Sequence, residues 1–258
     1  MLRSCSRRLV VYVGLLLSAF TLVLVAGCKS GEEGTTPAEP GGMKKAVSQA
    51  EPPAKTTAKE NATEEGAPEL KVGTTLENLQ AAFDGESNAH KRYLAFAAKA
   101  EEEGYKQAAL LFTAAARAEE IHAKSHAKVI EKLGGTPTAD IKEPEVKTTK
   151  ENLEAALKGE TYEKNTMYPE FLKVAKADKN ADAIRTLNGA MTVEEEHAAL
   201  YQAALDDLEG QKAITSPLWV CPVCGHTVQA QKLDFSNCPI CNTPADQFEK
   251  IDQVAAAK

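Results

Sequence analysis

The sequence predicts a mainly α protein in which a four-helix bundle is followed by a small module of strands and loops around four cysteines. Three observations lead to this prediction. The central part of the chain contains a duplicated segment, its apolar residues recur at steps of three and four, and the last part carries two Cys-x-x-Cys pairs. Steps of three and four place apolar side chains on one face of a helix, as the helices of a bundle require.

The composition agrees with this fold class. Of the 258 residues, 43% are hydrophobic and only 5% are aromatic, and the abundance of alanine favours helices over a β-sandwich. The net charge of -7 leaves no excess of basic residues to neutralise a phosphate backbone. We therefore expect no nucleic-acid partner.

The first 28 residues are typical of an export signal. A basic start precedes an apolar run over residues 9–26, and Cys28 follows directly after Val-Ala-Gly. Small residues before a cysteine resemble a bacterial lipobox, in which the cysteine is lipidated after cleavage. A plain membrane anchor is the alternative, because about 18 apolar residues can span a bilayer. Either interpretation predicts an exported, membrane-anchored protein that faces the periplasm or the cell exterior.

The next segment, residues 29–70, is rich in Gly, Pro, Thr, Glu and Lys. It contains too few large apolar groups to offset its chain entropy, so we predict a disordered tether. We assign residues 71–212 to the bundle and residues 216–258 to the four-cysteine module.

A duplication organises the bundle. The run ENLQAAFDGES at 77–87 matches ENLEAALKGET at 151–161, and further along AEEIH at 118–122 matches VEEEH at 193–197. Each half contains two helical patterns separated by a short polar break, which gives four helices.

A glutamate interrupts the apolar face of each of these four helices, and two of the glutamates are followed three residues later by a histidine. These residues are Glu86, Glu119, His122, Glu160, Glu194 and His197. Ionised carboxylates in a core are unfavourable unless they are paired or bind metal, and two divalent cations would compensate their charge. Di-iron and di-manganese bundles have this ligand pattern: two helices each supply one Glu, and the other two each supply a Glu-x-x-His pair. The sequence therefore predicts a two-metal site.

Three further side chains lie close to this pattern. Glu163 follows Glu160 by three residues and is expected to be an additional metal ligand, with a surface glutamate as the alternative. His126 and His90 continue the apolar faces of their helices. We interpret them as core histidines or neighbours of the site rather than as ligands.

The four-cysteine module has the spacing of a tetrathiolate metal site. Cys221 and Cys224 form one Cys-x-x-Cys pair, and Cys238 and Cys241 form the other. A Gly or Asn after the second cysteine of each pair can adopt the left-handed backbone conformation that such a site needs. The same four ligands fit one iron for electron transfer or one structural zinc.

Longer runs resemble the rubrerythrin family. GESNAHKRY at 85–93 is similar to the first helix of rubrerythrins, GETYEKNTMYPEF at 159–171 is similar to their third, and Trp219 precedes Cys221 as in their rubredoxin domain. The resemblance covers about residues 74–250. It implies a ferritin-like bundle with two irons and a rubredoxin-like domain with one iron. His226 is a departure, since an aromatic tyrosine often follows the glycine there.

The resemblance also implies a function. Rubrerythrins reduce hydrogen peroxide to water, with electrons relayed through the rubredoxin iron, as part of oxidative-stress defence. In that family Glu163 corresponds to a ligand of the oxidised site that His122 replaces on reduction, while Tyr93 and Tyr168 correspond to tyrosines that form hydrogen bonds near the irons. The resemblance further implies a head-to-tail homodimer.

Two other functions are compatible with the residues. One is a ferroxidase or iron-storage protein of the ferritin class, and the other is a non-catalytic metal-binding surface protein with zinc in both sites. If the protein is an exported peroxidase it cannot reach NADH, so we expect a membrane-linked or periplasmic electron donor.

Overall fold

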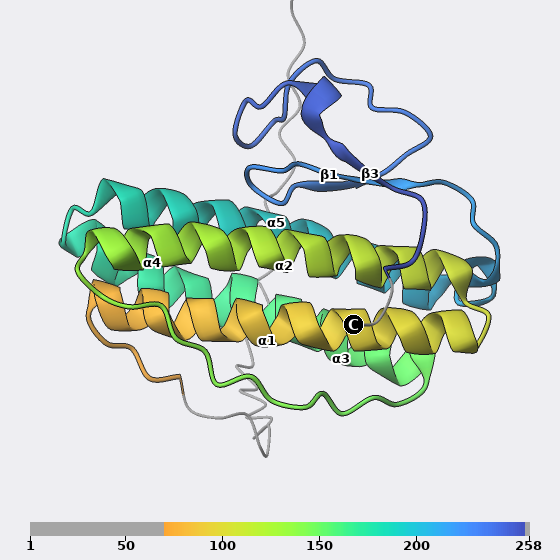
Figure 1. Cartoon of the computed structure of the whole chain (residues 1–258), viewed down its shortest axis with the longest axis horizontal. Coiled ribbons are helices and arrows are strands. Elements are labelled where there is room, and N and C mark those ends of the chain that lie inside the picture. Colours follow the sequence, from red (N-terminus) through yellow and green to blue (C-terminus); the bar gives the residue numbers. More distant parts are fainter. Residues whose placement is uncertain (1–69, 256–258) are drawn as a thin grey trace, which may run out of the picture. The chain divides into compact units, whose positions relative to one another are not determined.

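The computed structural model describes residues 70–255. The predicted export signal, with Cys28, and all but the last residue of the predicted tether lie outside these residues. The described part forms the predicted helical bundle followed by a small three-stranded module (Figure 1). Its elements are α1 (Thr75–Glu102), α2 (Lys106–Lys132), α3 (Thr149–Tyr162), the π-helical η1 (Glu163–Met167), α4 (Tyr168–Ala177), α5 (Ala181–Asp206), the 3-10 helix η2 (Glu209–Lys212), β1 (Leu218–Val220), β2 (Thr227–Gln229), η3 (Ala245–Gln247) and β3 (Glu249–Ile251).

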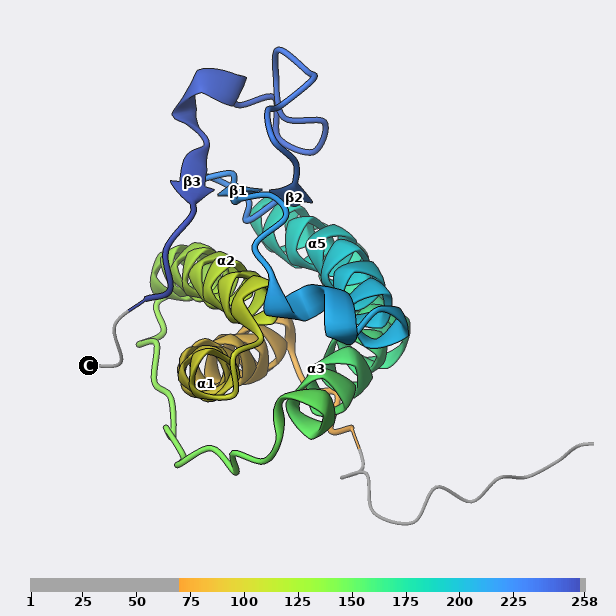
Figure 2. The same ribbon diagram turned by 90° about the vertical axis from the view of Figure 1, so that its right-hand side faces the viewer.

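The duplication reappears in the way that the helices begin. Thr74 caps α1 and forms a capping box with Glu77, and Thr148 caps α3 and forms the same box with Glu151. These reciprocal hydrogen bonds satisfy amide groups that have no partner within the helix. The end-on view in Figure 2 shows the resulting four-helix arrangement of α1, α2, α3 and α5.

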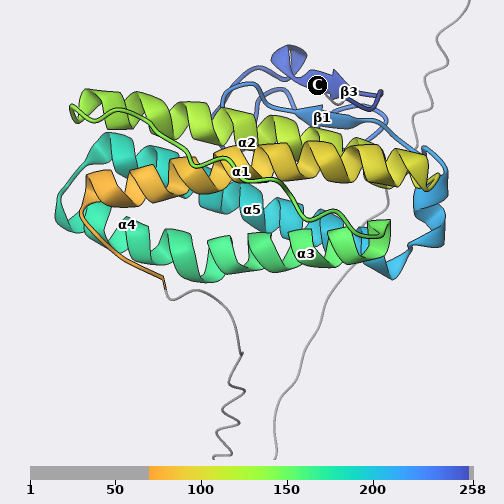
Figure 3. The ribbon, with the colours of Figure 1, turned by 60° about the horizontal axis from the view of Figure 1, so that its bottom comes forward.

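A long connection joins the two halves of the bundle and runs along α1 (Figure 3). The Asp140 amide donates to Asp84 at 2.6 Å, and the Lys142 amide donates to the Asn88 side chain at 2.9 Å. These bonds hold an otherwise irregular segment against the helix.

The core is divided into two apolar clusters. One contains Tyr93, Phe112 and Tyr201, and the other contains Leu79 and Phe171. In α1, α2 and α5, residues of one cluster precede the metal-site glutamate in sequence and residues of the other follow it. The predicted ligands therefore lie in a polar layer with packed apolar side chains on both sides.

The third predicted helix is not continuous. The π-helical η1 separates α3 from α4, and Pro169 lies in the first turn of α4. Proline has no amide hydrogen to donate to the preceding turn, and a π turn inserts an extra residue that rotates the helix face after it. Tyr168 is consequently fully buried, while Glu163 is half-buried.

The module that follows contains an antiparallel sheet in the order β2-β1-β3. Leu218 and Val220 of β1 are completely buried and belong to the same apolar cluster as α2. Among the helices of residues 70–255, none is both long and apolar enough to cross a membrane.

Candidate metal centres

The structure brings the six predicted bundle ligands together. They form two groups, Glu86-Glu119-His122-Glu194 and Glu119-Glu160-Glu194-His197, and the ligand atoms within each group all lie within 4.8 Å of one another. All six side chains are buried. Because Glu119 and Glu194 belong to both groups, they are placed to bridge two metal ions.

The hydrogen bonding of the histidines fits metal binding. His122 directs Nδ1 inward, 2.9 Å from Glu119 and 2.9 Å from Glu194. His197 does the same, with Nδ1 3.0 Å from Glu194. Their outer nitrogens each face an oxygen at 3.1 Å, the Cys224 carbonyl for His122 and the Thr227 hydroxyl for His197. A proton held at Nε2 leaves the Nδ1 lone pair free for a metal ion.

Unpartnered polar atoms provide a second test of the fit. Six buried side-chain atoms within residues 70–255 have no hydrogen-bond partner, and all but the Tyr201 hydroxyl belong to predicted ligands: Glu86 Oε2, Glu119 Oε1, both oxygens of Glu194 and His197 Nδ1. Buried polar groups without partners are strongly unfavourable. Two metal ions would satisfy the ligand atoms at once.

The electrostatics lead to the same conclusion. Burial raises the pKa of Glu86 well above its usual value, and the charges of Glu163 and Glu119 raise it further. Burial also raises the pKa of Glu160, with Glu119 and Glu194 adding to the effect. For Glu119, burial opposes ionisation, but the hydrogen bond with His122 and the nearby His197 ring outweigh it and lower the pKa. A metal-free site would therefore take up protons that metal ions displace.

The four cysteines form a separate site. Their sulfur atoms lie within 4.8 Å of one another, with Cys221 and Cys241 3.5 Å apart and Cys224 and Cys238 3.6 Å apart. A disulfide would bring two sulfurs to about 2.05 Å. The residues after the two pairs have the predicted left-handed conformation, with φ of 81° at Gly225 and 64° at Asn242. These loops aim four thiolates at one tetrahedral ion.

Comparison with known proteins agrees with both sites. The model of the family described as "Rubrerythrin" matches residues 77–205, and that of "Rubrerythrin, rubredoxin-like domain" matches residues 219–249. The chain belongs to the rubrerythrin family. It thus has a di-iron site in a ferritin-like bundle and a rubredoxin-like four-cysteine site, as predicted.

Several rubrerythrin relatives are similar over most of their length. Nigerythrin of Nitratidesulfovibrio vulgaris is 39% identical over 69% of this chain and 86% of its own length. Rubrerythrin-2 of Clostridium acetobutylicum is 34% identical over 70% of this chain and 98% of its own. The structure of fully reduced, all-ferrous nigerythrin has a TM-score of 0.66, with 36% identity over 70% of this chain and 89% of that one.

The two tyrosines that the rubrerythrin resemblance assigns to the site lie beside its outer carboxylates. Tyr93 donates to Glu160 Oε1 at 2.6 Å, and Tyr168 donates to Glu86 Oε1. Both phenols are buried. Each of these two glutamates is thereby oriented through one oxygen.

Glu163 differs from the other predicted ligands. It lies in η1, and it belongs to neither group of close ligand atoms. Burial, together with the charges of Glu194 and Glu119, raises its pKa to about 8. Its role as a ligand stays a prediction. His90 is not part of either group, since its Nδ1 lies 2.6 Å from the Ala116 carbonyl oxygen.

The rubredoxin-like domain is in direct contact with the bundle of the same chain. Besides the bonds to His122 and His197, Arg117 makes two 2.7 Å bonds to Glu249. His226, the departure from the family pattern, lies 2.6 Å from Glu196 and packs edge-on against Phe248.

Sequence reasoning missed several contacts of the site. It did not identify Thr227 beside His197, Glu196 beside His226, or Thr186, whose hydroxyl lies 3.0 Å from His126 Nδ1. The spacing of residues within a helix gives no signal for these contacts, because each joins segments far apart in the sequence.

Proposed function

We propose that the protein is a peroxidase that reduces hydrogen peroxide to water, with electrons passing from the rubredoxin-like iron to the di-iron site. One observation carries the proposal. The carbonyl of Cys224, a predicted ligand of the four-cysteine site, lies 3.1 Å from Nε2 of His122, a predicted ligand of the di-iron site. An electron would thus cross one peptide group, one hydrogen bond and one imidazole ring.

The chain's own residues have defined parts in this proposal. The two irons, held by the six predicted bundle ligands, would supply two electrons for cleavage of the O–O bond. The four-cysteine iron would then return electrons to the di-iron site. His122 connects the two sites through its two ring nitrogens, while Tyr93 and Tyr168 orient Glu160 and Glu86. Apolar clusters pack on both sides of the polar layer. The proposal retains Glu163 and His122 as alternating ligands. In the oxidised site, where Glu163 would be bound, His122 would still reach the irons through its 2.9 Å contacts with Glu119 and Glu194.

A rapid-mixing experiment tests this function. The full-length, iron-loaded protein in detergent is reduced without oxygen and mixed with hydrogen peroxide, and the visible band of the oxidised rubredoxin-like site is followed. We expect the band to return rapidly, with two electrons consumed per peroxide. The control is Glu119→Ala, which removes a bridging carboxylate. An equally slow return in both proteins would refute the proposal.

The two alternative functions correspond to other outcomes. Oxidation of added ferrous iron without peroxide consumption would favour a ferroxidase, although a storage protein has no need of an electron-transfer domain. Zinc in both sites after growth in iron-rich medium would favour a non-catalytic metal-binding protein.

We also propose that the protein is a lipoprotein anchored through Cys28, that it meets peroxide outside the cytoplasmic membrane, and that it receives electrons from a membrane-linked or periplasmic donor. The motif before Cys28 supports this proposal. Mass spectrometry of the mature N-terminus tests it, and an unmodified Cys28 in a soluble cytoplasmic protein would contradict it. The homodimer also remains a proposal, and sedimentation velocity tests it.

A further inference from the structure

A continuous line of side-chain hydrogen bonds extends from the di-iron site to the outside of the bundle. Tyr168 of α4 donates to Glu86 of α1. The Tyr168 hydroxyl lies 3.1 Å from Nε2 of His126 on α2, and Nδ1 of His126 lies 3.0 Å from the hydroxyl of Thr186 on α5. The line thus joins four side chains from four different helices.

The hydrogen-bonding capacity of each group fixes the direction of the line. The single hydroxyl proton of Tyr168 is donated to Glu86, so the phenol oxygen can only accept from His126. His126 therefore carries its proton on Nε2, and its Nδ1 accepts from Thr186. Every donor points toward Glu86. This is the arrangement needed to move a proton inward.

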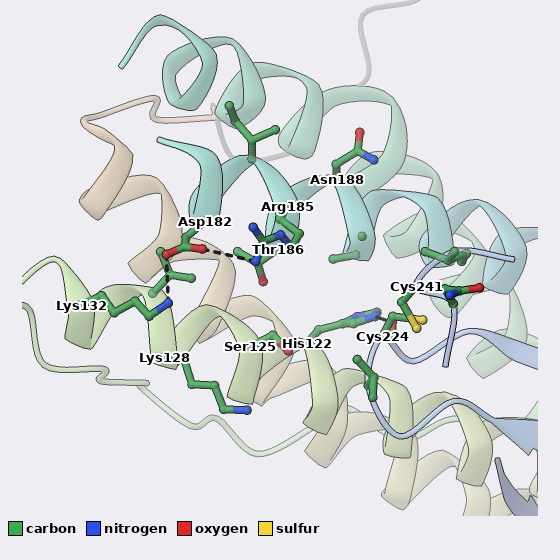
Figure 4. A pocket seen from close by; sticks show the side chains of 17 residues that line it. His122, Ser125, Lys128, Lys132, Asp182, Arg185, Thr186, Asn188, Cys224 and Cys241 are labelled. Atoms are coloured by element: carbon green, nitrogen blue, oxygen red, sulfur yellow. Dashed lines mark hydrogen bonds and ion pairs between the residues drawn. The ribbon is translucent and has the colours of Figure 1, made fainter. Parts of the chain in front are cut away.

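The outer end of the line reaches a cavity. Thr186 is half-buried and lines a cavity of about 780 Å³ between α2, α5 and the cysteine loops (Figure 4). Other polar side chains of this cavity include Ser125, Lys128 and Asn188. A cavity of this size and polarity admits water. His126, the next group inward, has no exposed surface.

The other tyrosine at the site has different surroundings. Tyr93 packs against the rings of Phe96, Phe112 and Tyr201, with centroids 5.7–6.2 Å away. The Arg92 guanidinium lies 5.2 Å from the Tyr93 ring centroid, and the Tyr93 hydroxyl forms a hydrogen bond only to Glu160 among the described residues. The polar line beyond Tyr168 thus distinguishes the two otherwise similar tyrosine–glutamate pairs.

We propose that Thr186, His126 and Tyr168 form a proton relay that carries protons from water in the cavity to Glu86 at the di-iron site. The need for such a relay rests on the proposed function, because reduction of hydrogen peroxide to two water molecules consumes two protons along with two electrons. The electrons come from the irons, and the protons come from solvent.

Each passage of a proton is balanced. Glu86 Oε1 gains the Tyr168 hydroxyl proton, Tyr168 gains the Nε2 proton of His126, Nδ1 of His126 gains the Thr186 proton, and Thr186 gains one from water. Glu86 then gives up its proton to the peroxide oxygen that becomes water. Before the next passage, the Tyr168 and Thr186 hydroxyls rotate and the His126 side chain reorients so that its protonated nitrogen again faces Tyr168. Burial lowers the pKa of His126 to about 3, so the ring stays neutral.

The first test is kinetic. In Thr186→Val and His126→Leu, the peroxide-driven return of the rubredoxin-like band should slow by about 100-fold, the low side of what positioned proton transfer contributes. The slowing produced by D₂O in the unaltered protein should also be lost. Thr192→Val is the matched control, because its hydroxyl bonds only to the Asn188 carbonyl within α5. Iron content should be the same in all four proteins.

The second test needs no turnover. In the zinc-loaded protein, nitrogen-15 NMR should show the His126 proton on Nε2, and its exchange with solvent should be slower in Thr186→Val than in Thr192→Val. Unchanged exchange, or peroxide reduction at the full rate in Thr186→Val, would overturn the relay. If the unaltered protein does not reduce peroxide, the proposed function fails, and the exchange measurement still decides whether this path carries protons.

Discussion

Gly225 packs directly against the predicted ligand His122, and Gly225→Ala should disturb both stability and the proposed electron transfer. Its φ of 81° belongs to the left-handed region, which costs a residue with a Cβ about 1–2 kcal/mol. A Cβ at this position would also lie 2.7 Å from His122 Nε2 and 3.2 Å from Ala118 Cβ. Those atoms are part of a packed helix, so the cysteine loop would have to move away.

The displacement would break the bond between the Cys224 carbonyl and His122, whose loss costs about another 1 kcal/mol. We therefore expect Gly225→Ala to lower the free energy of unfolding by about 2–3 kcal/mol. Gly104→Ala is a matched control, because Gly104 has φ of 82° but no atom within 4 Å of its added Cβ. That variant should lose only the conformational part, about 1–2 kcal/mol.

Urea unfolding of the zinc-loaded proteins measures the difference in stability. In the iron-loaded proteins, the return of the rubredoxin-like band after peroxide addition measures electron transfer, which should slow in Gly225→Ala but not in Gly104→Ala. Equal destabilisation by the two substitutions, with electron transfer unchanged in both, would refute the inferred close contact.

Three further predictions concern the di-iron site. The metal-free protein should lose stability as pH rises from 5 to 8. The folded-state pKa values of Glu163 and His197 are raised to about 8 and about 9, so the folded state binds more protons than the unfolded state in this range. Urea titrations at several pH values measure this change, and a stability that rose with pH would contradict the prediction. Thr227→Val removes the hydroxyl that faces His197 Nε2 and should weaken metal binding about 10–100-fold. The control, Thr113→Val, alters a buried threonine away from the ligands and should leave metal binding unchanged. Competition with a chelator measures the metal affinity of both variants. Tyr93→Phe leaves Glu160 Oε1 without its buried donor and should destabilise the metal-free protein by about 1–3 kcal/mol, as measured by urea unfolding.

Much of the bundle could be predicted from the sequence because its determinants are local and repeated. The Glu-x-x-His spacing places Glu119 beside His122 within one helix, and the duplication repeats that geometry at Glu194 and His197. A carboxylate in an apolar helix face implies a compensating charge wherever the helices pack. The six predicted ligands could therefore be expected to meet at one site before the helix arrangement was known.

The remaining features depend on tertiary structure. A regular helix would place Glu163 on the same face as Glu160, as the sequence predicts. In the structure Glu163 begins the π turn at Glu163–Met167, and this turn changes which residues after it face the core. The contact of Thr186 with His126 joins residues 60 apart in the sequence, and that of His122 with Cys224 joins residues 102 apart. No periodicity within a single element encodes such pairs.

The rubredoxin-like domain also contributes to the construction of the di-iron site. Each ligand histidine has one nitrogen facing the carboxylates and the other facing an oxygen of this domain, the Cys224 carbonyl for His122 and the Thr227 hydroxyl for His197. Those oxygens keep the proton on Nε2, and only that tautomer offers Nδ1 to a metal ion. The contact with this domain therefore sets the tautomer of two predicted ligands. A change at the interface should therefore alter metal affinity as well as the proposed electron transfer, because both depend on the same pair of imidazole rings.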